Sequence, residues 1–160
     1  MNKIIVFIQI FAITVIGTFT GAMIMLYTAI LAFWKQATST EFLNWYANYS
    51  TGIMDSTGPL LMSSIVLPLI CAFLVWRNRQ SRMYWLISFI LTGMIMLITL
   101  NYFVDVNTSF GNKSIELNSI KETLNTWGNF HLVRIFLAFI STLIGAFGLV
   151  KYISSKRQIN

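Results

Sequence analysis

Four long apolar stretches constrain this chain more than any other feature of its sequence. They cover residues 4–34, 58–76, 83–104 and 130–152. An α-helix crosses the hydrocarbon core of a bilayer with roughly 17 to 25 apolar residues, so each stretch is long enough to span it. The sequence predicts an all-α integral membrane protein, a four-transmembrane-helix antiparallel bundle forming a single membrane domain over residues 1–160.

The charged residues support this interpretation by their scarcity and by their positions. Only 10% of the residues are charged, against about a quarter in soluble domains. The net charge of +6 does not indicate nucleic-acid binding, because the basic residues lie at the ends of the apolar stretches rather than in a patch. The single cysteine, Cys71, lies within the second stretch and is interpreted as a small buried apolar residue.

Orientation follows from the distribution of lysine and arginine. Most of these residues cluster at three chain segments: Lys3, then Arg77, Arg79 and Arg82, then Lys151, Lys156 and Arg157. The positive-inside rule therefore predicts a multi-pass protein of the cell membrane with both termini cytoplasmic. Residues 35–57 and 105–129 would form two outer loops. The first 22 residues resemble a signal peptide, but the apolar stretch continues to Trp34, which favours an uncleaved first span.

Each outer loop is predicted to contain a short interfacial helix. In the first loop, Phe42, Trp45, Tyr46 and Tyr49 recur at helical spacing, which is typical of a helix lying on the membrane with its aromatic face down. Gly52 and Gly58 would end this helix, and Pro59 would begin the second span. In the second loop, residues 115–127 form an amphipathic pattern that predicts a lid over the bundle.

Small residues line one face of the first span and one face of the fourth. On the first span the face recurs at spacings of three and four, at Thr14, Thr18, Gly21, Met25, Thr28 and Ala32. In lipid such a stripe favours close helix packing, because small side chains let two backbones approach. The stripes would also suit a homo-oligomer. Pro68 lies mid-way along the second span and is expected to kink it.

The beginning of the fourth span carries the most unusual polar residues. Trp127, His131, which is the only histidine, and Arg134 lie at positions i, i+4 and i+7, and therefore on one helical face. That face continues through Ala138, Ser141 and Gly145, so we expect it to point into the bundle. Ionisable groups inside a membrane span are expensive and predict a functional site.

Polar residues at the end of the third span would lie at the same level. Asn101, Asp105 and Asn107 are followed by a polar loop. In an antiparallel bundle the end of the third span meets the beginning of the fourth. Asp105 and Asn107 are therefore candidate neighbours of His131 and Arg134.

The chain resembles the anthrone oxygenase family of small four-span membrane proteins over nearly its whole length. The resemblance is carried by Trp127, His131 and Arg134 at the fourth-span entrance. It is also carried by the run Phe103-Val-Asp-Val-Asn107, in which Asn107 matches the family's final asparagine and Asp105 stands where proline is usual. Gly17, Gly21 and Pro59 are weaker matches.

The resemblance implies insertion of molecular oxygen into a flat phenolic substrate without a cofactor. In that case His131 would act as the base, Arg134 or Asn107 would stabilise the anion, and Asp105 would orient His131. Trp127 and loop aromatics such as Trp45 would stack on the substrate, beside Asn101. The substrate would be a flat aromatic or lipid-like molecule taken from the bilayer.

Other interpretations remain open. His131 and Arg134 could form a structural lock, with Arg134 paired to Asp105 or Glu122. A non-catalytic membrane scaffold or accessory subunit, binding lipid or a partner helix, is the main alternative function. Haem ligation by one histidine and one methionine is a minor alternative, because one histidine cannot supply the usual paired imidazoles of a haem in a helix bundle. Metal catalysis is weaker still, since no second histidine or cysteine lies at metal-ligand spacing. A proton-coupled transporter would normally carry an acidic residue mid-span, and none lies there.

Overall fold

The structure, a computed structural model, describes residues 2–157, which form only helices and their connections. The elements are α1 Lys3–Met25, a π-helical turn Leu26–Ile30, α2 Leu31–Gln36, α3 Ser39–Leu74, α4 Arg79–Ile98, a second π-helical turn Thr99–Phe103, α5 Val104–Gly111, a 3₁₀ turn Leu117–Ser119 and α6 Ile120–Arg157. Because the π-helical turns join their neighbours without a break, these elements make four rods.

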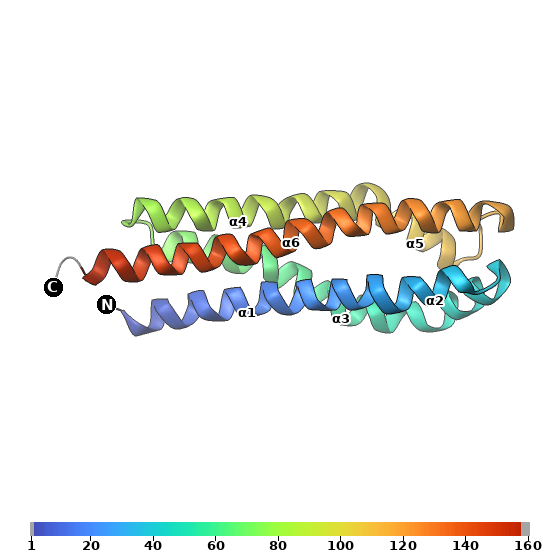
Figure 1. Cartoon of the computed structure of the whole chain (residues 1–160), viewed down its shortest axis with the longest axis horizontal. Coiled ribbons are helices and arrows are strands. Elements are labelled where there is room, and N and C mark those ends of the chain that lie inside the picture. Colours follow the sequence, from blue (N-terminus) through green and yellow to red (C-terminus); the bar gives the residue numbers. More distant parts are fainter. Residues whose placement is uncertain (1, 158–160) are drawn as a thin grey trace.

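All four rods are long and apolar enough to cross a membrane, which confirms the predicted four-helix membrane bundle. Figure 1 shows the start of α1 and the end of α6 at one end of the bundle, and α2, α5 and the connections that follow them at the other, called the distal end below. The α6 helix packs against α4 and α1, and α3 packs against the same two helices. The bundle is therefore antiparallel, and its distal end brings together α2, α5 and the first half of α6.

The first interfacial helix is present but is not separate from the second span. The α3 helix begins with a capping box, in which the Thr38 hydroxyl accepts from the backbone of Glu41 and the Glu41 carboxylate accepts from the backbone of Thr38. It then continues for 36 residues through Gly52, Gly58 and Pro59. A glycine inside a helix costs only about 1 kcal/mol. Burial of Phe42 and Tyr46 in the distal core stabilises the first part of this helix against the local breaking signals.

The second interfacial helix likewise merges with the fourth span. It starts at Ile120 and runs for 38 residues to Arg157, with Leu124 and Trp127 buried. Residues 120–127 are therefore the first turns of α6 and not a lid that lies across the bundle. As a consequence, Trp127, His131 and Arg134 occupy one uninterrupted helix whose direction is fixed by the whole bundle.

Aromatic side chains dominate the distal core. Trp34, Phe42, Tyr46, Phe103, Phe110 and Trp127 are all buried there, and neighbouring rings meet mostly edge to face, as Phe42 and Phe110 do at 4.9 Å. Such pairs contribute roughly 0.5–1.5 kcal/mol each beyond their buried area. The distal end is therefore a packed region and not a set of loose loops.

In the half of the bundle nearer the termini, a few polar contacts connect the helices. The Trp85 indole donates to Gln9 over 2.9 Å, and the hydroxyls of Ser88 and Ser141 lie 2.7 Å apart. The predicted inward face of the fourth span is buried at Ala138, Ser141 and Gly145. The small-residue stripe of the first span behaves differently, because Thr14, Thr18, Gly21, Thr28 and Ala32 are all exposed and do not pack within this chain.

Candidate functional site

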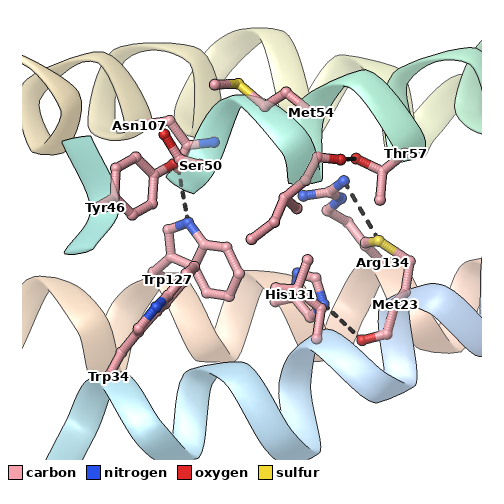
Figure 2. A pocket seen from close by; sticks show the side chains of 12 residues that line it. Met23, Trp34, Tyr46, Ser50, Met54, Thr57, Asn107, Trp127, His131 and Arg134 are labelled. Atoms are coloured by element: carbon pink, nitrogen blue, oxygen red, sulfur yellow. Dashed lines mark hydrogen bonds between the residues drawn. The ribbon is translucent and has the colours of Figure 1, made fainter. Parts of the chain in front are cut away.

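A small cavity lies within the distal half of the bundle. Its volume is about 60 Å³, room for water-sized molecules and far below the roughly 300–1,000 Å³ of a typical ligand pocket. It is lined by Met23, Leu26, Trp34, Tyr46, Ser50, Ile53, Met54, Thr57, Asn107, Trp127, His131 and Arg134. Figure 2 shows these side chains converging from all four rods.

His131 is held in one orientation by its neighbours. It is 1% exposed, and its ring lies nearly parallel to the Trp127 indole, with 4.6 Å between centroids. Its Nε2 lies 2.9 Å from the backbone oxygen of Met23. Because a carbonyl can only accept, Nε2 must carry the hydrogen. In the neutral ring the lone pair is therefore on Nδ1, which is buried without a hydrogen-bond partner.

Arg134 is buried without a counter-ion. Its side chain is 8% exposed, its Nη2 donates to the Met23 sulfur over 3.8 Å, and its guanidinium lies over the Phe103 ring, 4.2 Å from the centroid. The Nε–H has no partner. Asp105 and Glu122, the partners of the predicted lock, are both exposed, and neither forms an ion pair with Arg134 within residues 2–157. Arg134 thus presents a positive charge with unused donors.

Asn107 is tied to α6 by a single hydrogen bond. Its Oδ1 accepts from the indole Nε1 of Trp127 over 3.0 Å. An amide whose oxygen is engaged in this way offers its NH₂ group as a donor. Trp127 therefore makes two contacts in the site, because its side chain donates to the Asn107 amide and stacks on the His131 ring.

Both π-helical turns lie beside this cluster. The first starts three residues after Met23, the residue that contacts both His131 and Arg134. The second ends at Phe103, whose ring lies under the Arg134 guanidinium. A π-helical turn inserts one residue into a regular helix and is frequently found at functional sites. Two such turns on different rods, both next to residues that contact His131 or Arg134, therefore favour a functional site at this cavity.

Unpartnered polar atoms concentrate at the same cavity. Within the described part of the chain, four buried side-chain nitrogen or oxygen atoms have no hydrogen-bond partner: Trp34 Nε1, Tyr102 Oη, His131 Nδ1 and Arg134 Nε. Three of the four residues line the cavity. Because leaving a buried polar group unsatisfied costs about 1–3 kcal/mol, this concentration points to a polar ligand or water at the cavity.

A larger groove adjoins the cavity. Its volume is about 590 Å³, and it lies between α3 and the rod formed by α4, the second π-helical turn and α5. Ser50, Met54, Thr57, Asn107 and Arg134 line both the groove and the cavity. In Figure 2 the Arg134 guanidinium lies between Met23 on one side and Thr57 on the other. Arg134 therefore stands at the boundary between the two spaces.

The structure brings together four of the seven residues singled out in the sequence. Asn107, Trp127, His131 and Arg134 line the cavity. Asp105 is exposed because it lies two residues from Asn107, about 200° around the helix, and it does not orient His131. Asn101 is exposed and donates to the Leu97 carbonyl over 2.8 Å. Trp45 packs on Trp34 from outside the cavity, 5.6 Å between centroids.

Residues of the first span were missed by the sequence reasoning. Met23 supplies the oxygen that holds His131 and the sulfur that contacts Arg134, yet a methionine in an apolar span carries no signal of its own. Three residues of other spans that lie beside the site were also not predicted. Ser50 and Thr57 lie in a segment that was expected to be an outer loop and is helix in the structure. Phe103 lies in the run that resembles the family, and its aromatic ring was the sequence feature that could have indicated its contact with Arg134.

The described residues contain no group of three or more histidine, cysteine, aspartate or glutamate side chains that could hold a metal ion. The polar groups that face the cavity are instead donors and one basic nitrogen. This set suits an anionic oxygen, because donors and a cation surround the space and no carboxylate lines it.

Comparison with known proteins shows the family of the chain. No curated protein and no solved structure matches the chain. A family model described as anthrone oxygenase matches residues 45–144, well over half of the chain, and these limits include most of α3, all of α4 and α5, and the α6 residues Trp127, His131 and Arg134. The chain is a membrane protein of the anthrone oxygenase family.

Proposed function

We propose that this protein is a cofactor-independent oxygenase that acts on a flat phenolic substrate at the distal end of the bundle. The observation that carries the proposal is the buried guanidinium of Arg134, which has no counter-ion. Burying a charged group costs several kcal/mol. A sulfur is a weak acceptor, and a cation–π contact contributes only about 2 kcal/mol, so these two contacts do not offset that cost.

An anionic ligand would offset it. A phenolic tricyclic substrate becomes an extended phenolate or enolate when it loses a proton, and its oxygen would accept from the guanidinium and from the Asn107 NH₂ group. Both donors would be in place before the charge develops, and preorganised donors in a water-poor site are the most effective stabilisers of a forming anion.

His131 is the base in this proposal. The hydrogen bond from Nε2 to the Met23 oxygen leaves the lone pair on Nδ1, which has no competing partner. This nitrogen would take the proton from the acidic carbon of the substrate. A positioned base of this kind contributes typically 10²–10⁴-fold to the rate. Trp127 is a positioning residue, because it stacks on the His131 ring and holds the Asn107 amide.

The reaction balances without a further reductant. A methylene carbon that loses two hydrogens and gains one oxygen atom becomes a carbonyl, and the second oxygen atom of O₂ leaves as water. The substrate carbanion supplies the electrons. The chain's task is to remove the first proton, to hold the resulting anion and to exclude bulk water from the distal core.

The direct test is oxygen uptake by the purified protein in lipid nanodiscs with 1,8-dihydroxyanthrone as the probe. We expect one O₂ consumed per probe molecule, formation of the quinone, and a rate lowered by roughly 10²-fold or more in His131→Gln. Exchange of an exposed residue at the other end, Gln80→Ala, should leave the rate unchanged. A wild-type rate equal to protein-free autoxidation would refute the proposal.

A non-catalytic scaffold is a second candidate, and the exposed small-residue stripe of the first rod, from α1 to α2, favours it. Thr14, Thr18, Gly21, Thr28 and Ala32 leave a flat face where another helix could approach closely, in a second copy of the chain or in a partner. Mass spectrometry of molecules that co-purify in mild detergent separates the two functions. A flat aromatic species lost in His131→Ala supports the oxygenase, whereas lipid alone in both proteins supports the scaffold.

The cellular setting is part of the proposal. The basic residues Arg77, Arg79 and Arg82 lie at the end of the bundle that holds both termini. By the positive-inside rule that end would be cytoplasmic in the cell membrane, with the site near the outer leaflet. A cysteine-labelling experiment at exposed loop positions would test it, since reagents that do not cross the membrane should label Asn112→Cys in intact cells and leave Arg79→Cys unlabelled.

A further inference from the structure

The groove between α3 and the α4–α5 rod is much larger than the small cavity beside His131, called the inner cavity below. With about 590 Å³ against about 60 Å³, only the groove falls in the size range of small-molecule sites. A tricyclic molecule therefore cannot occupy the inner cavity without large rearrangement of the aromatic core. The inner cavity has room for species of the size of dioxygen or water.

The groove lies along the helices and crosses the level of the membrane boundary. It extends on α3 from Ala47 to Leu61, about 20 Å of helix. Counting about 20 residues from the basic end of each rod places the distal hydrocarbon boundary near residues 25, 55, 103 and 130. The groove therefore begins outside the hydrocarbon and ends inside it.

The lining changes character along this length. The part beyond the boundary presents polar groups, with Thr51, Thr108 and Asn112 among them. The part within it presents Leu61 and Phe103, together with Thr57 and Thr99, whose hydroxyls already donate to backbone oxygens of their own helices. Met54 and Val104, which line the groove near the boundary, are 46% and 45% exposed. The groove is thus open sideways at the depth where a bilayer would surround it.

Arg134 connects the groove with the reactive residues. It lines both spaces, its guanidinium is the buried and unpaired charge, and its position on α6 is one turn from His131. A ligand in the groove would place an oxyanion on Arg134 and its reactive carbon towards the inner cavity. A ligand with apolar rings and one acidic oxygen would match this groove, because the rings would contact its apolar part and the oxygen would contact Arg134.

We propose that the groove is the substrate compartment, filled sideways from the bilayer by a flat amphiphile with one oxyanion, and that Arg134 separates it from an inner compartment that admits only dioxygen or water. This rests on the proposed function for the identity of the small reactant. The location of the ligand does not depend on turnover and can be tested by binding alone.

Two tryptophan substitutions test the groove in nanodiscs, with binding of 1,8-dihydroxyanthrone followed anaerobically by its absorbance and by quenching of protein fluorescence. Val104→Trp would cover the sideways opening and occupy the groove beside it. Leu100→Trp is the matched control, because Leu100 is 57% exposed on the same rod, one turn from Val104, and does not line the groove.

The expected result is at least tenfold weaker binding in Val104→Trp, with Leu100→Trp within about threefold of the wild type and all melting temperatures alike. Equal binding by Val104→Trp and the wild type, or no binding to the wild type, would each overturn the inference. If Val104→Trp does not fold, Thr51→Trp and Thr99→Trp take its place, and unchanged binding in both would overturn it. Binding that follows the expected order while no oxygen is consumed would support the groove and refute the oxygenase.

Discussion

His131 and Met23 are joined by a hydrogen bond of 2.9 Å between the imidazole Nε2 and a backbone oxygen on α1. The contact fixes which ring nitrogen carries hydrogen, and it brings the fourth rod's only histidine against the first rod. The backbone oxygen cannot be removed by substitution at Met23. The orientation of the imidazole and the nitrogen that carries its hydrogen therefore depend on the position of the α1 backbone and not on the Met23 side chain.

Nitrogen chemical shifts of the histidine ring can check this arrangement. Because the chain has one histidine, ¹⁵N-histidine labelling gives one pair of ring signals. We expect Nε2 to resonate as a protonated nitrogen and Nδ1 as an unprotonated one in the ligand-free protein, since only Nε2 has an acceptor. A protonated Nδ1 with an unprotonated Nε2 would contradict the structure. Labelled His131→Gln protein should lose both signals and confirm their assignment.

Replacement of Arg134 by methionine separates a site from a structural lock. Met keeps much of the side-chain volume and removes a buried charge that has no counter-ion, so the melting temperature should stay or rise, by the equivalent of about 1–4 kcal/mol. Probe binding should fall at least tenfold. Arg82→Met is the control, because the Arg82 guanidinium also lies over a ring, that of Trp76 at 4.3 Å, far from the cavity. A large loss of stability in Arg134→Met would favour the lock.

Removal of one residue from the first π-helical turn tests what that turn does. Ala29 is exposed within Leu26–Ile30, and its deletion would restore regular helix while keeping the register on both sides. We expect a folded protein of unchanged or higher melting temperature with turnover lowered on the order of 10²-fold, as for a displacement of about 1 Å at a reactive group. Deletion of Val15, which lies in the regular helix α1, is the control. It would rotate all residues on one side of the deletion out of their packing positions, so we expect that protein not to fold. Full activity after loss of Ala29 would show that the turn has no part in the site.

The close approach of α6 and α4 makes a prediction about stability alone. A Cβ on Gly145 would lie 3.2 Å from two carbons of the Trp85 ring, and that ring is fully buried and held by Gln9. Gly145→Ala should therefore destabilise the protein by about 1–3 kcal/mol. Gly93→Ala is the control, because its Cβ would meet nothing within 4 Å and should stabilise the helix by up to about 1 kcal/mol. Thermal unfolding in detergent measures both, and equal melting temperatures would contradict the contact.

The fold class could be predicted because its cause is local. Each apolar stretch must satisfy its own backbone hydrogen bonds inside the lipid, and only a helix does so within one segment. The inward face of the fourth span was also predictable, since Ala138, Ser141 and Gly145 repeat at the helical period and all proved buried. The helix ends were not predictable in the same way, because Gly52, Gly58 and Pro59 are local signals that the aromatic packing of Phe42 and Tyr46 overrides.

The candidate site was predictable in part. The i, i+4, i+7 spacing placed Trp127, His131 and Arg134 on one face, and the antiparallel order brought Asn107 to them. Asp105 was expected beside His131 because it is close in sequence to Asn107, but adjacent positions on a helix point in different directions. The part played by Met23 had no sequence signal, because the contact joins residues 108 positions apart and uses a backbone oxygen.

The sequence by itself determined that four apolar helices cross a membrane and that a histidine and an arginine share one face of the last of them. Those properties follow from composition and from the 3.6-residue period, which act within a single segment. Only the tertiary structure decided that Arg134 has no counter-ion, that Nδ1 of His131 is free, and that a groove meets a small cavity between them. Each of these depends on which atoms of different rods come within contact distance, and that is set by the packing of the whole bundle.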